Sequence, residues 1–173
     1  MKHIGDAIGG SLVIAAVSTL GDYLWANFLP HHRSIYGLTH GTLLFLAVGL
    51  YLGVGAHKAA IGAIGGALLG FLAAGSFYVL RPVLGYAGMF LMYIGVWVGL
   101  GLLNGRVLQP SRAPLSEVLI RSVVAAIGTG VAFYVISGIW FPFNPHGWDY
   151  AVHFAAWTVA YFPAFAALLL KRP

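Results

Sequence analysis

Residues 59–80 read AAIGAIGGALLGFLAAGSFYVL, an apolar run that contains no charged residue. A helix of this length, at about 1.5 Å per residue, crosses the roughly 30 Å of hydrocarbon in a bilayer. The run also lacks the alternation of apolar and polar residues that is typical of strands in a membrane β-barrel. It therefore predicts a transmembrane α-helix.

Further apolar stretches of similar length surround this one, at residues 7–28, 36–56, 83–103, 118–140 and 148–170. Across the chain, 60% of the residues are hydrophobic and 8% are charged, and the mean hydropathy is +0.89. A soluble domain cannot bury that much apolar surface. The short connections favour antiparallel packing of successive helices. We predict an all-α membrane protein in which residues 1–173 form one bundle of six transmembrane helices.

The basic residues separate by side when six spans are assumed. Arg33 and Arg81 fall on one side, and the other side holds seven of the nine: Lys2, Lys58, Arg106, Arg112, Arg121, Lys171 and Arg172. The positive-inside rule then places both termini in the cytoplasm. Because the basic residues are scattered between apolar runs, the pI of 9.7 indicates topology and not nucleic-acid binding. Short loops without an organelle signal favour a prokaryotic inner membrane.

Small residues form a row along the stretch at residues 59–80. Gly62, Gly66 and Gly70 stand four residues apart, and Ala74 continues the row. Such a face lets two helix backbones approach closely inside a bilayer. Packing within the bundle is our first interpretation, and a homo-oligomer formed through this face is the alternative.

Ionisable residues from three stretches reach similar depth on the non-cytoplasmic side. Asp22 lies about 9 Å below the end of its helix, His40 about 6 Å and His153 about 7 Å inside theirs. Arg81 ends a helix on the same side. Because an ionisable group in hydrocarbon costs at least a few kcal/mol, Asp22 predicts a functional site. The alternative is that Asp22 pairs with Arg81 or a nearby histidine and only holds helices together.

Tryptophans accompany this polar layer. The pattern WxxFxPH occurs at residues 25–31 and again at residues 140–146, where aromatic residues of a membrane interface are also expected. Trp97 and Trp157 fall near mid-span and suit the wall of a hydrophobic cavity. The predicted ligand-binding residues are Asp22, Trp25, His40, Arg81, Trp97, Trp140, Asp149, His153 and Trp157.

The histidines also allow a metal interpretation. His146, Asp149 and His153 follow HxxDxxxH spacing, although Asp149 in the first turn of a helix is also an ordinary cap. No HExxH pair, cysteine, P-loop or GxSxG elbow occurs. We therefore favour a protein that is not an enzyme and has no cofactor, and a metal-dependent membrane enzyme is kept as an alternative.

The stretch at residues 36–56 allows a family comparison. His40-Gly41-Thr42 leads through Val48-Gly49-Leu50 to Tyr51. This resembles a helix of the Insig family, in which a Gly-Thr pair is followed at the same distance by Gly, Leu and Tyr. Looser similarity continues through residues 52–58, 70–80 and 121–140. The resemblance implies six helices with cytoplasmic termini and a membrane-open central cavity.

An Insig-like protein would sense or hold a lipid, either diacylglycerol or a sterol-like molecule. The acidic residue with which the family engages a protein partner is not evident around Arg106, so no such partner is implied. Six-helix substrate-binding components of vitamin importers have similar length and orientation. In that alternative, the outer His, Asp, Arg and Trp side chains would hold a small polar nutrient.

The six-span topology is testable by accessibility labelling of an otherwise cysteine-free chain. We expect residues 31–33 and 144–147 to be labelled from the same, non-cytoplasmic side, because each segment follows an outward-running helix. Labelling of the two segments from opposite sides would contradict the six-span arrangement.

Overall fold

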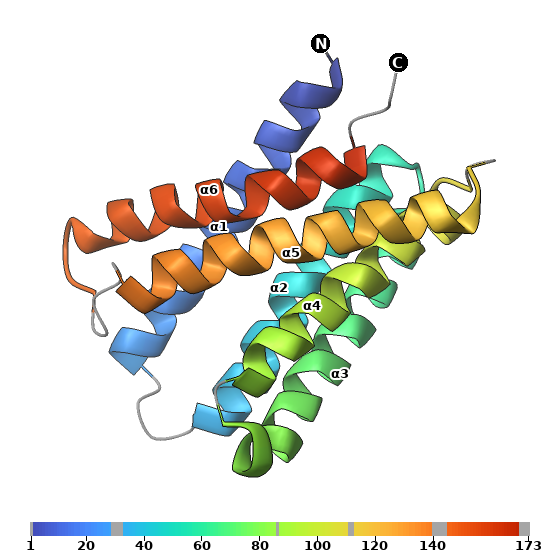
Figure 1. The fold of residues 1–173 in the computed structure, drawn as a ribbon. Coiled ribbons are helices and arrows are strands. Elements are labelled where there is room, and N and C mark those ends of the chain that lie inside the picture. The colour runs from blue at the N-terminus through green and yellow to red at the C-terminus, as the bar shows by residue number, and fades with distance from the viewer. Residues whose placement is uncertain (1, 29–32, 86, 111–112, 140–144, 170–173) are drawn as a thin grey trace.

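The computed structural model describes residues 2–28, 33–85, 87–110, 113–139 and 145–169, and every regular element in these ranges is helical (Figure 1). The elements are α1 (Lys2–Phe28), α2 (Arg33–Gly55), α3 (Ala59–Leu84), α4 (Ala87–Leu102), the π-helix η1 (Leu103–Leu108), α5 (Leu115–Ile139) and α6 (Asp149–Leu169). Six helical segments, one of them α4 continued by η1, are long and apolar enough to cross a membrane. The prediction of an all-α, multi-pass membrane protein is confirmed.

The predicted boundary between the third and fourth helices is displaced. The sequence places the break between α3 and α4 around Arg81 and Pro82, but α3 continues through both residues to Leu84. Gly85 ends the helix with a φ of 57°, and its N–H donates a 2.8 Å hydrogen bond to the carbonyl oxygen of Arg81. A glycine adopts this left-handed conformation without a Cβ clash, so Gly85 is the effective helix stop.

The helices form a ring in which the first and last spans are neighbours. α1 packs mainly against α6, α6 against α5, α5 against α4, α4 against α3, and α3 against α2. Contact between α1 and α2 is small, although they follow each other in sequence. The start of α1 and the end of α6 lie at one end of the bundle, here called the terminal end (Figure 1). Phe28 and Tyr150 lie at the opposite end.

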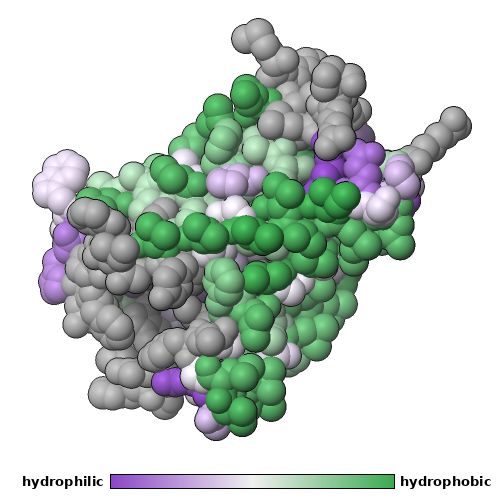
Figure 2. Space-filling model, viewed as in Figure 1, coloured by the Kyte–Doolittle hydropathy of each residue, from purple (hydrophilic) through white to green (hydrophobic). Residues whose placement is uncertain are grey.

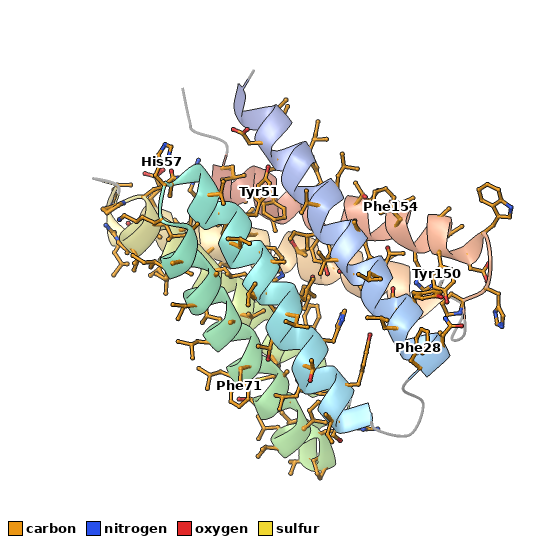
Figure 3. The ribbon with its side chains drawn as sticks, turned by 180° about the vertical axis from the view of Figure 1, so that it is seen from behind. Phe28, Tyr51, His57, Phe71, Tyr150 and Phe154 are labelled. Atoms are coloured by element: carbon orange, nitrogen blue, oxygen red, sulfur yellow. The ribbon has the colours of Figure 1, made fainter. Side chains whose placement is uncertain are left out.

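Two separate contacts connect α1 with α2. At the terminal end, the Tyr51 hydroxyl donates a 2.6 Å hydrogen bond to the carbonyl oxygen of Asp6, and its ring packs edge-on against Phe165 of α6 (Figure 3). Toward the opposite end, the Tyr36 hydroxyl donates to the carbonyl oxygen of Gly21. Between these two contacts the helices leave room for a cavity.

The glycine row of α3 lies against α2 of the same chain. A Cβ added at Gly62 or Gly66 would collide with a carbonyl oxygen of α2, and one at Gly70 would collide with the carbonyl oxygen of Gly41. All three glycines are buried in this contact. A homo-oligomer formed through the same row would first have to displace α2.

The outer surface is suited to lipid. Exposed apolar side chains recur along α3 and α5, and on α5 they include Ile120, Val124, Ile127, Val131 and Val135. Phe71 on α3 is 49% exposed (Figure 3). Figure 2 shows hydrophobic residues over much of the middle of the bundle, with the most hydrophilic residues near its ends. This distribution is expected of helices that cross a bilayer.

The α2–α3 contact predicts a difference between two glycines of one helix. Gly66→Ala should lower the free energy of unfolding by about 1–3 kcal/mol, because the new methyl group meets backbone that cannot rotate away. Gly75→Ala is the matched control, since its Cβ would meet only Leu38 at 4.0 Å. Thermal or denaturant unfolding in detergent measures both. Equal stabilities for the two variants would contradict the packing.

Candidate functional site

Asp22 is held by two donors from α6. Its Oδ2 atom lies 2.8 Å from Nδ1 of His153 and accepts a 2.8 Å hydrogen bond from the indole Nε1 of Trp157. His153 and Trp157 are one helical turn apart and both buried, while the Asp22 side chain is 26% exposed. A carboxylate in a membrane helix needs such partners, because hydrocarbon offers none.

A second polar contact continues the same seam one turn further along. The hydroxyls of Ser18 and Tyr161 are 2.9 Å apart, and both residues are almost fully buried. Ser18 precedes Asp22 by four residues, and Tyr161 follows Trp157 by four. Polar rows of the antiparallel helices α1 and α6 therefore face each other with matching spacing.

His40 approaches this seam from α2. Its ring stacks on Tyr36 with a centroid distance of 5.6 Å and an interplanar angle of 11°. It also lies against Gly21, where an added Cβ would collide with the imidazole. Gly21 directly precedes Asp22, so the His40 ring lies beside the turn of α1 that carries the carboxylate. The structure thus brings Asp22, His40 and His153 into one layer.

A cavity of about 230 Å³ opens beside this layer. α1, α2, α3, α4 and α6 all contribute to its wall. Much of its wall is apolar, with Phe45 and Val96 among the residues. Its polar lining residues are Ser18, His40, Tyr78, Tyr93, Trp157 and Tyr161. The cavity therefore presents a limited set of hydrogen-bonding groups in a largely hydrophobic space.

A shallower groove of about 160 Å³ runs between α3 and α4. It shares Ala73, Met92 and Val96 with the cavity, so the two spaces are adjacent. Leu72, which also lines the groove, is 60% exposed on the outer surface. Through this groove, the cavity wall lies next to the outer surface that lipid would contact.

Other predicted site residues lie away from the cavity. Trp97 is fully buried behind it and packs edge-on against Phe45 and Phe165, with a centroid distance of 6.1 Å to each. Arg81 is exposed near the end of α3 and is not among the residues that line the cavity. The side chain of Trp25 and all of Trp140 lie outside the described residues.

Asp149 caps its own helix. Its Oδ2 accepts a 2.9 Å hydrogen bond from the backbone N–H of His146, three residues earlier. This contact has the geometry of a reciprocal helix cap. The Asp149 carboxylate is thus engaged by the backbone of His146, and the His153 ring is bound to Asp22. The described residues contain no group of three His, Cys, Asp or Glu that could hold a metal ion.

Sequence reasoning did not single out Ser18, Tyr36 and Tyr161. A usable signal was present, because Ser18 and Asp22 are spaced by four, as are His153, Trp157 and Tyr161. Two polar rows with helical spacing on apolar spans indicate faces that need a partner. Only the structure shows that the two rows are partners of each other.

The Asp22 contacts predict unequal effects of two similar substitutions. Asp22→Asn should lower the free energy of unfolding by about 1–3 kcal/mol, because two buried donors lose a charged acceptor. Asp149→Asn is the matched control and should cost less than about 1 kcal/mol, since asparagine also caps helices. Unfolding in detergent measures both variants. Equally negligible effects would remove Asp22 from the site.

Comparisons of the chain with protein-family models, with curated proteins and with solved structures found no match.

Proposed function

We propose that this chain is a non-enzymatic membrane protein that holds an amphipathic lipid in its central cavity. The supporting observation is the composition of the cavity wall, which is largely apolar and carries a few hydroxyl, imidazole and indole groups. Ligand sites in proteins typically combine an apolar lining with a few placed polar groups. An occupant with one small polar end and a hydrophobic body suits this wall.

The polar groups favour a hydroxyl over a charged headgroup. Ser18 and Tyr161 each carry a hydroxyl that both donates and accepts, and the His40 ring offers a further nitrogen. The carboxylate of Asp22 is already engaged by His153 and Trp157. Diacylglycerol and sterols share a single hydroxyl on an apolar body, so either class fits these groups. A vitamin-like nutrient with many polar atoms would leave most of them without partners.

The size of the cavity requires part of the ligand to lie outside it. Small-molecule pockets commonly measure about 300–1,000 Å³, and this cavity holds about 230 Å³. The groove between α3 and α4 is adjacent and adds about 160 Å³. We propose that the polar end sits at Ser18 and His40 and that the apolar body extends past Met92 toward the bilayer.

A sensor or regulator is the role that this arrangement serves best. The resemblance of residues 40–51 to the Insig family supports the same assignment. Ligand would bridge α2, α3 and α4 to the α1–α6 pair, since all five helices line the cavity. Occupancy would then bias how closely α1 approaches α2, whose direct contact is small.

Binding to the purified protein tests the proposal. A fluorescent diacylglycerol and a fluorescent sterol are titrated separately in detergent, and at least one should bind saturably. Ala73→Phe should weaken that binding about tenfold or more, because the ring fills the wall shared by cavity and groove. Ala60→Phe, on an exposed part of the same helix, is the matched control and should bind normally.

Mass spectrometry of the gently extracted protein separates the alternatives. Co-purified diacylglycerol or sterol-like lipid supports the proposal. A vitamin-like molecule would indicate an importer component, and stoichiometric zinc or iron would indicate a metal enzyme. Failure of both lipid probes to bind, or equal binding by Ala73→Phe and Ala60→Phe, would contradict lipid binding in this cavity.

A further inference from the structure

A second cavity lies at the terminal end, remote from the first. It measures about 320 Å³ and is formed where η1, the start of α5 and the end of α6 meet. Asn104, Gln109, Glu117 and Arg121 line it together with Leu168. None of these residues borders the central cavity. Figure 2 shows hydrophilic surface gathered at this end of α5 and α6.

Asn104 carries a buried acceptor in this cavity. The residue is 6% exposed, and its Nδ2 donates a 3.4 Å hydrogen bond to the carbonyl oxygen of Leu168 in the last turn of α6. That bond orients the amide, since a flipped amide would set two oxygens against each other. Within the part of the chain that the structure describes, Oδ1 of Asn104 has no hydrogen-bond donor. A buried acceptor of this kind is stabilised by a donor from a ligand.

The surroundings of Asn104 favour a positively charged donor. Both η1 and α6 end here, so the carbonyl-rich, partially negative ends of two helices lie at the cavity. Lys58 engages one of these carbonyls, that of Val107, at 2.6 Å. The start of α5 also lies here, and Glu117 in its first turn sets a carboxylate against the partially positive end of that helix. π-Helical turns such as η1 occur frequently at functional sites.

Arg121 supplies the opposite charge. It follows Glu117 by one helical turn on α5 and lines the same cavity. A ligand that carries an ammonium group and an anionic group a few bonds apart would match these two side chains. The ammonium would face Glu117, and the anionic group would face Arg121. Leu115 and Ile120 are exposed on α5 beside them, by 55% and 59%, and offer an apolar track away from the cavity.

We propose that this cavity binds the phosphoethanolamine headgroup of a membrane phospholipid. The ammonium donates to Oδ1 of Asn104 and to the Glu117 carboxylate, and the phosphate pairs with Arg121. The acyl chains run along the exposed apolar face of α5. The binding is independent of the ligand in the central cavity.

Lipid competition measured by native mass spectrometry tests this assignment. The purified protein is offered equal amounts of phosphatidylethanolamine and phosphatidylglycerol with identical acyl chains. The unaltered chain should retain the ethanolamine lipid about tenfold better, as expected for a hydrogen-bonded ammonium. Glu117→Gln and Asn104→Leu should each remove most of this preference. Asp149→Asn, which removes a carboxylate at the opposite end, should keep it.

Two outcomes would overturn the proposal: equal retention of both lipids by the unaltered chain, or an undiminished preference in both cavity variants. Circular dichroism and size-exclusion chromatography check that each variant is folded, and Glu117→Gln changes a half-exposed side chain at a helix start. Free phosphoethanolamine is tested alongside. If it raises the melting temperature as much as the lipid does, and Glu117→Gln abolishes the rise, the same site holds a soluble zwitterion.

Discussion

A carboxylate inside a membrane helix is the constraint from which this structure follows. Asp22 cannot be solvated by hydrocarbon, and both donors that satisfy it come from α6, through His153 and Trp157. The Ser18–Tyr161 contact extends the pairing by a turn. Together they make the first and last spans neighbours and draw α1 away from α2. The central cavity occupies the space that opens because α1 packs on α6 and not on α2.

Two kinds of helix contact therefore enclose the cavity. On one side, α1 and α6 meet through polar side chains with directional hydrogen bonds. On the other, α2 and α3 meet backbone to backbone along Gly62, Gly66 and Gly70. The α1–α6 contact supplies Ser18, Trp157 and Tyr161 to the cavity wall. The α2–α3 pair supplies small apolar residues such as Gly41, Gly70 and Ala74, together with His40 and Tyr78. An amphipathic interior results from the difference between the two.

The sequence predicts the helices better than it predicts which helices pack against each other. Six spans and the shared depth of Asp22, His40 and His153 follow from length and helical rise, which are local properties. Which face of α1 meets which face of α6 depends on long-range packing, and short connections wrongly suggest that α1 packs mainly on α2. The α3 boundary was missed because Pro82 looks like a stop, whereas the backbone conformation of Gly85 determines it. Trp97 was assigned to the cavity wall from its depth alone, but its side chain lies in the aromatic core behind it.

The glycine contact also has a mechanical consequence. Side chains can change rotamer to absorb a shift between helices, but two backbones in direct contact have no such freedom. We expect α2 and α3 to move as one rigid body. Any widening of the interior then falls on the sparse boundary between α1 and α2, where the hydroxyls of Tyr36 and Tyr51 donate hydrogen bonds to α1. These two tyrosine contacts are the ones that such a widening would have to stretch or break.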